Sequence, residues 1–87
     1  MTHQAIKKAK KLFKLWSWRK VTLVIYHDIV SNYNPVINTY MIDENKPIQW
    51  ILQFQDKNHT VLEKIYILAL NKDIHNIYKY ITNFGNQ

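Results

Sequence analysis

The stretch Ile-Gln-Trp-Ile-Leu-Gln-Phe-Gln-Asp, residues 48–56, carries the clearest secondary-structure signal in the chain. Large apolar residues take every second position there, and glutamines take most positions between them: Ile48, Trp50, Leu52 and Phe54 against Gln49, Gln53 and Gln55. Because successive side chains of a strand point to opposite faces, this period of two predicts a β-strand. We expect its apolar face to be buried and its glutamines to be exposed.

Two segments before this stretch predict further strands. Residues 21–30 are rich in β-branched and aromatic side chains, as in a strand that is covered on at least one face. Residues 36–43 lead into residues 48–56 through Glu-Asn-Lys-Pro at 44–47, a composition that suits a hairpin connection. Residues 21–56 therefore predict a three-stranded antiparallel sheet, with a loop at 31–35.

The chain after this stretch predicts a long C-terminal helix over residues 60–84. Thr60 and Glu63 have the spacing of a capping box, and Gly85 follows as a stop signal. Between them apolar residues recur every three or four positions: Leu62, Tyr66, Leu70, Ile74, Ile77, Ile81 and Phe84. The triplet Asn-Lys-Asp at 71–73 leaves a break open, at which Asn ends one helix and Asp caps the next.

Residues 3–16 predict an amphipathic helix inside a basic N-terminal segment, residues 1–20. One side of this helix collects apolar residues: Ala5, Ile6, Ala9, Leu12, Phe13 and Trp16. The other side collects lysines: Lys7, Lys10, Lys11 and Lys14. Leu15 and Trp18 project from the basic side, so we expect Trp16 in the core and Trp18 in solvent.

The order helix, three strands, helix predicts an α+β fold of the type α-β-β-β-α, with the helices packed on one face of the sheet. This order resembles that of the double-stranded RNA-binding domain over nearly the whole chain. That family has lysines at the start of its last helix beside a glycine-containing loop, whereas residues 56–63 have only Lys57 and no Gly. The resemblance is one of topology and does not assign the chain to that family.

Length and composition indicate one small domain, residues 1–87, of which 47% are hydrophobic. The absence of cysteine excludes disulfides and thiolate metal sites, so stability must come from packing, with a homodimer interface left open as a further source. No apolar run reaches the roughly 18 residues of a membrane span, and the N-terminus lacks the pattern of a signal peptide. We therefore expect a cytoplasmic protein.

The charge is concentrated at one end of the chain. Residues 1–20 hold seven basic side chains and no acid, whereas residues 21–87 hold five lysines and six acids, a net charge of −1. The candidate binding residues all come from the basic segment: Lys7, Lys10, Lys11, Lys14, Trp18, Arg19 and Lys20. Their cations can displace the counterions condensed on a phosphate backbone, and Trp18 can stack on an unpaired base or dock on a partner.

No residue pattern predicts catalysis. The four histidines, His3, His27, His59 and His75, lack the spacing of metal ligands, so we expect no metal and no cofactor. His27 and Asp28 offer a base beside a carboxylate, but adjacent strand residues point to opposite faces. A single Gly, at position 85, excludes a phosphate-binding loop. We expect a protein that is not an enzyme.

The leading hypothesis is a small accessory protein that binds nucleic acid or an acidic nucleoprotein surface, mainly through phosphate contacts. The alternative is a non-enzymatic inhibitor or adaptor that docks on a host protein complex, of the anti-defence or toxin–antitoxin type. In that case the glutamines of residues 48–56 and the C-terminal tyrosines matter as much as the lysines. Membrane-surface binding by the basic helix and a ribonuclease-like toxin built around His27 rank below both. Abundant Ile, Lys, Asn and Tyr, which tend to have AT-rich codons, hint at a phage or mobile element.

Overall fold

A computed structural model describes residues 2–27, 33–34, 39–40 and 43–83 of the chain. Its elements follow in the order α1 (Thr2–Leu15), the 3₁₀ turn η1 (Ser17–Arg19), β1 (Thr22–Tyr26), β2 (Tyr33–Asn34), β3 (Thr39–Tyr40), β4 (Ile48–Gln55), β5 (Val61–Ala69), the 3₁₀ turn η2 (Asn71–Asp73) and α2 (Ile74–Thr82). An N-terminal helix, a three-stranded antiparallel sheet and a C-terminal helix confirm the predicted α+β fold.

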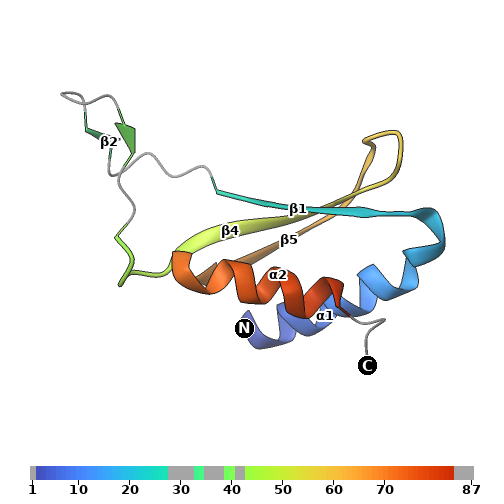
Figure 1. The fold of residues 1–87 in the computed structure, drawn as a ribbon, viewed down its shortest axis with the longest axis horizontal. Helices are drawn as coiled ribbons and strands as arrows, with labels where there is room; N and C mark the ends of the chain where they lie inside the picture. Colours follow the sequence, from blue (N-terminus) through green and yellow to red (C-terminus); the bar gives the residue numbers. More distant parts are fainter. Residues whose placement is uncertain (1, 28–32, 35–38, 41–42, 84–87) are drawn as a thin grey trace.

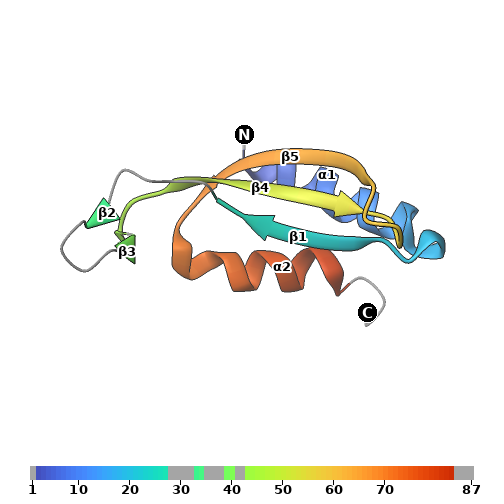
Figure 2. The ribbon, with the colours of Figure 1, turned by 90° about the horizontal axis from the view of Figure 1, so that it is seen from above.

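The central strand of the main sheet is β4, in the strand order β1-β4-β5. The antiparallel register places Leu23 of β1 beside Phe54, and Leu52 beside Ile65 of β5. Both helices lie on the same side of this sheet (Figure 1), with α1 behind β5 and α2 along the β1 side (Figure 2). The sheet therefore has one face that the helices cover and one face that no described helix covers.

The covered face and the apolar sides of the two helices form one core. Its largest fully buried side chains are Phe54, Leu52 and Ile81, from β4 and α2. The buried indole of Trp50 keeps its polar atom satisfied, because its Nε1–H donates a hydrogen bond to the carbonyl oxygen of Ala69 at 3.0 Å. Each large apolar side chain buried in this way contributes about 1.5–3 kcal/mol to stability.

The prediction that β4 buries one face is confirmed, and its glutamines lie on the other face, where Gln49 alone of the three is exposed. Gln49 is exposed, and Gln53 is half-buried and accepts a hydrogen bond from the Tyr26 hydroxyl at 3.0 Å. Ile51 is the buried exception on this face, since the register places it between Tyr26 of β1 and Tyr66 of β5. Two aromatic neighbours are enough to shield one aliphatic side chain without a covering helix.

The prediction that residues 36–43 pair with β4 is wrong for the part that the structure describes. Thr39–Tyr40 (β3) pairs with Tyr33–Asn34 (β2) in a separate two-stranded ribbon, and residues 36–38 and 41–42 lie outside the described residues. The physical reason is that β1 and β5 occupy both edges of β4, and a strand has only two edges. A turn still forms before β4, where the Lys46 N–H donates to the Asp43 carbonyl oxygen at 3.1 Å.

Residues 61–69 form β5, so the predicted helix over residues 60–84 is wrong for its first part. Ile65 and Ile67 face the core from alternate positions, while Tyr66 between them is exposed. Apolar side chains on both faces give this segment a helical period and a strand period at once. Its β-branched and aromatic residues, together with the free edge of β4, favour the strand.

The last part of that predicted helix is confirmed as α2, and residues 71–73, where the sequence leaves a break open, form η2 between β5 and α2. The apolar stripe of α2 packs against the core through three isoleucines: Ile74, Ile77 and Ile81. Asp73 stands at the N-cap position, but its side chain makes no capping hydrogen bond. Phe84 and Gly85 lie outside the described residues, as do residues 28–30 of the first predicted strand.

A cavity-forming substitution tests whether α2 closes the core. Ile81 is 0% exposed, so we expect Ile81→Ala to lower the free energy of unfolding by about 2–5 kcal/mol. Tyr78→Ala, one turn earlier and 40% exposed, is the control and should cost less than about 1 kcal/mol. Urea denaturation measures both variants. Equal losses in the two would show that α2 does not cover the sheet.

Candidate functional site

Lysines line the side of α1 that points away from the sheet. The helix packs inward through its apolar side, of which Ala9 is fully buried. Lys7, Lys11 and Lys14 are exposed on the opposite side, as predicted, and form what we call the lysine face. The lysine face and its neighbours line a shallow hollow of the surface: Gln4, Lys7, Lys8, Lys10, Lys11, Lys14 and Tyr80.

Two other lysines of α1 contact neighbouring elements instead of pointing freely into solvent. The Lys8 Nζ lies 3.4 Å from a carboxylate oxygen of Glu63 on β5. The Lys10 Nζ stands over the Tyr80 ring of α2, 4.2 Å from its centroid, in a cation–π contact. These contacts tie the two flanks of α1 to β5 and α2, and they leave the lysine face between them.

Four cations of the basic segment contact neither an acid nor an aromatic ring among the described residues: Lys7, Lys11, Lys14 and Lys20. Lys20 follows η1 with a left-handed backbone at φ 55°, and its side chain is exposed. The structure thus places all the predicted binding residues, with Lys10 and Arg19 already engaged by other side chains. Their part in binding stays a prediction.

The two tryptophans near the end of α1 lie where the sequence predicts. Trp16 packs into the core, with its ring edge-on to that of Phe54 at a centroid distance of 5.8 Å. Trp18, in η1, is 77% exposed. Leu15 is 63% exposed and so projects from the basic side as expected. An exposed indole leaves a large flat apolar surface in solvent, whereas tryptophan is highly buried on average.

At the end of the sheet, η1 meets the turn between β4 and β5. The residues there line a second hollow, which we call the Trp18 hollow: Trp18, Arg19, Lys20, Asp56, Lys57 and Asn58. The Arg19 guanidinium lies 3.9 Å from an Asp56 carboxylate oxygen and 5.7 Å from the centre of the Trp18 ring. Arg19 therefore connects the exposed indole to the β4–β5 turn.

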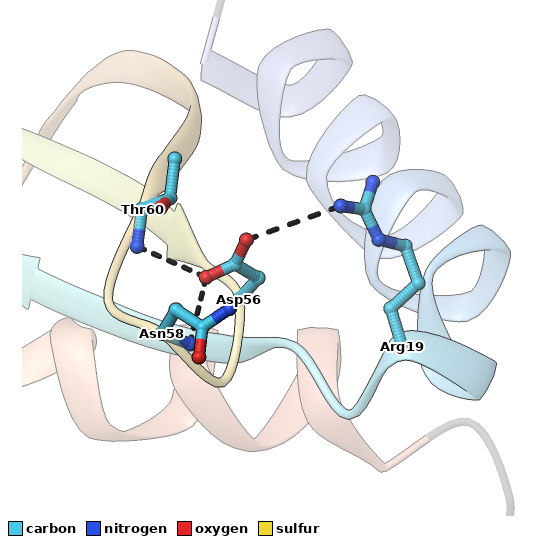
Figure 3. A network of polar contacts seen from close by, with 4 residues as sticks. All are labelled: Arg19, Asp56, Asn58 and Thr60. Atoms are coloured by element: carbon cyan, nitrogen blue, oxygen red, sulfur yellow. Dashed lines mark hydrogen bonds and ion pairs between the residues drawn. The ribbon is translucent and has the colours of Figure 1, made fainter.

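The Asp56 carboxylate holds this turn together (Figure 3). Its Oδ1 accepts hydrogen bonds from the backbone N–H groups of Asn58 at 2.8 Å and Thr60 at 3.0 Å, and its Oδ2 faces Arg19. The backbone closes the turn as well, because the His59 N–H donates to the Asp56 carbonyl oxygen at 2.9 Å. His59 has a left-handed backbone at φ 67°, a conformation that costs a non-glycine residue about 1–2 kcal/mol. Asp56 offsets part of that cost.

The remaining candidates for chemistry do not assemble into a site. The His27 ring packs edge-on against Trp50 at a centroid distance of 4.6 Å, and Asp28 lies outside the described residues. Within residues 2–27, 33–34, 39–40 and 43–83, no group of three His, Asp or Glu side chains could hold a metal ion. In the same part of the chain, no helix is long and apolar enough to cross a membrane.

The structure also places the helix start on which the resemblance to the double-stranded RNA-binding domain depends. The last helix begins at Ile74, and only Lys72 precedes it closely, with Asp73 beside it. The lysine cluster of that family is therefore absent at this position too. The chain matches no protein-family model, and neither a curated protein nor a solved structure gives a significant match.

Sequence reasoning missed the contribution of the β4–β5 turn to this end of the molecule. Lys57 and Asn58 line the Trp18 hollow, yet they stand almost forty residues from Trp18 in the chain. The turn was missed because Thr60 was predicted to cap a helix. A helix start at residue 60 puts residues 56–59 in a linking loop and not in a hairpin turn. The Asp-Lys-Asn sequence at 56–58 between two apolar runs was the available signal for a hairpin.

Substitutions in the turn distinguish the observed structure from a helix start at Thr60. We expect Asp56→Ala to lower the free energy of unfolding by about 1–2 kcal/mol, because two backbone N–H groups lose their acceptor. Thr60→Ala should cost less than about 0.5 kcal/mol, since only the backbone of Thr60 bonds to Asp56. Urea denaturation of both variants provides the measurement. A larger loss for Thr60→Ala than for Asp56→Ala would contradict the turn.

Proposed function

We propose that the chain binds nucleic acid, or the acidic surface of a nucleoprotein, through the lysine face of α1 and the cations that follow it. The observation that supports this most is a row of exposed lysines without an acidic partner among the described residues. Binding of this kind neutralises phosphates and releases their counterions, and it needs no catalytic group. The protein acts as an accessory factor and not as an enzyme.

The spacing of the lysines argues against a merely solvated surface. Lys7 and Lys11 stand at i, i+4 on α1, and Lys11 and Lys14 stand at i, i+3, so like charges face each other along the helix. Each such pair lowers the stability of the helix by a few tenths of a kcal/mol, whereas glutamate at alternate positions of this row would raise it by about as much. A polyanion that lies along this row relieves the repulsion.

Recognition is electrostatic and largely independent of sequence. The lysine face offers ammonium groups, which contact phosphates as point charges. Apart from Gln4, the hollow along α1 lacks the Arg, Asn and Gln side chains that read base edges in pairs of hydrogen bonds. We therefore expect similar affinity for different sequences of the same length.

Salt dependence tests the proposal directly. Four free cations, at about 0.9 released counterions each on duplex DNA, give a slope of log affinity against log salt near −4. Substituting Lys7, Lys11 and Lys14 by Gln should reduce the slope by about 3 without lowering the melting temperature, since the repulsion along the row is relieved. We would measure fluorescence anisotropy with labelled DNA and RNA from low to physiological salt.

The matched control removes the same charge elsewhere. Lys46, Lys64 and Lys72 are exposed and lie outside α1. Replacing these three by Gln also lowers the net charge by three, from +6 to +3, but should change the slope by less than about 1. Equal effects of the two triple variants would indicate a response to net charge alone. Absence of binding at low salt would remove the proposal.

A second candidate function is docking on a host protein complex, as a non-enzymatic inhibitor or adaptor. The observation that favours it is the uncovered face of the sheet, where Tyr66 is 54% exposed and Leu68 is 61% exposed beside Gln49. Exposed apolar groups side by side on a strand are typical of protein contacts. Pull-down from the native host with and without nuclease separates the two functions, because nuclease should release the partners of a nucleic-acid binder and should spare those of a docking protein.

A further inference from the structure

The Trp18 hollow brings an exposed aromatic ring, a guanidinium group and two lysines together. Trp18 presents an exposed indole, and Arg19 stands 5.7 Å from the ring centre on the side of the β4–β5 turn. Bases stack on such rings because every base has a π-face, and a neighbouring guanidinium strengthens the contact. A volume of about 340 Å³ lies at the lower limit of small-ligand sites and leaves room for a planar ring.

The one acidic residue that lines the Trp18 hollow does not repel a phosphate. The Asp56 carboxylate is occupied on Oδ1 by two backbone N–H groups and faces the Arg19 guanidinium through Oδ2 (Figure 3). Its side chain is only 16% exposed, so its charge is compensated locally before any ligand arrives. The turn thereby keeps Arg19 beside Trp18 instead of leaving it free in solvent.

Two cations of the Trp18 hollow remain free for a phosphate. Lys20 and Lys57 are exposed and have no acidic partner among the described residues. They come from different elements, the end of η1 and the β4–β5 turn, and both line the hollow with Trp18. One nucleotide of an open strand can stack its base on the indole and place its phosphate between these lysines.

We propose that the Trp18 hollow is a stacking subsite for single-stranded nucleic acid, placed where the lysine face of α1 leads into the end of the sheet. The proposal rests on the proposed function and names its substrate: an unpaired strand or overhang in preference to a continuous duplex. A base inside a duplex has both faces covered by its neighbours and cannot reach Trp18. The lysines of α1 then hold the phosphates of the flanking nucleotides.

Phosphate contacts weaken as the salt concentration rises, whereas stacking depends little on salt, and the experiment uses this difference. We expect Trp18→Ala to weaken binding of a labelled single strand by about 5- to 100-fold and binding of the blunt duplex by less than about twofold. The salt slope should not change, because no cation is lost. Trp18→Tyr should restore most of the affinity, since an aromatic ring is back in place.

Unlike Trp18, Lys20 and Lys57 should contribute to the salt slope. Replacing Lys20 and Lys57 by Gln should reduce the salt slope on the single strand by about 1.4, at about 0.7 per phosphate contact. The control pair, Lys46 and Lys64 replaced by Gln, should leave it nearly unchanged. Tyr78→Ala, which removes an exposed aromatic ring from α2, serves as the control for Trp18→Ala.

The outcomes separate this proposal from the proposed function. Suppose that the wild-type protein binds and that the α1 triple variant weakens this binding. If Trp18→Ala then binds like the wild type, or loses equal affinity for the single strand and the duplex, the stacking subsite is overturned and the lysine face is retained. Failure of the wild-type protein to bind any strand at low salt overturns both. The subsite is supported if Trp18→Ala weakens binding of the single strand, Trp18→Tyr restores it, and Tyr78→Ala binds like the wild type. Thermal melting checks that Trp18→Ala is folded.

Discussion

The packing of two helices on one face of β4 is the constraint on which the rest of the molecule depends. Without disulfides, and with only three strands in the main sheet, a small domain has a single apolar surface large enough to hold it together. Phe54 and Leu52 stand at its centre and are fully buried, and Ile81 closes it from α2. Any charge on the inner sides of the helices would be buried without a partner, so the lysines of α1 must point outward.

This constraint explains both the successes and the failures of sequence reasoning. The strand at residues 48–56 and the helix at residues 3–16 are amphipathic with one period each, so burial and periodicity agree and the predictions hold. Residues 61–69 are apolar on both faces, because Ile65 faces the core and Tyr66 lies on the uncovered face. Their periodicity fits a helix and a strand equally, and the free edge of β4, together with their β-branched and aromatic residues, favours the strand.

In the candidate site, too, the sequence predicts some features and misses others. The sequence predicts the exposed lysines and Trp18, because their placement follows from the direction of the helix and from its apolar side. Contacts between distant elements, such as Lys10 with Tyr80 and Arg19 with Asp56, depend on where α2 and the β4–β5 turn lie. A chain that places residues 61–69 in a helix cannot bring Lys57 to Trp18. The missed residues of the site are thus a consequence of the assignment of residues 61–69 to a helix.

Asp56 links the stability of this end of the protein to its electrostatics. The same carboxylate accepts the N–H groups of the turn and pairs with Arg19, so its removal loosens the β4–β5 turn and frees a cation at the same time. A change in nucleic-acid binding after a substitution at Asp56 would therefore have two causes that oppose each other. Trp18 and Lys57 are exposed and make no contact that closes the turn. They are for this reason the positions at which the proposed binding can be tested without altering the structure of the turn.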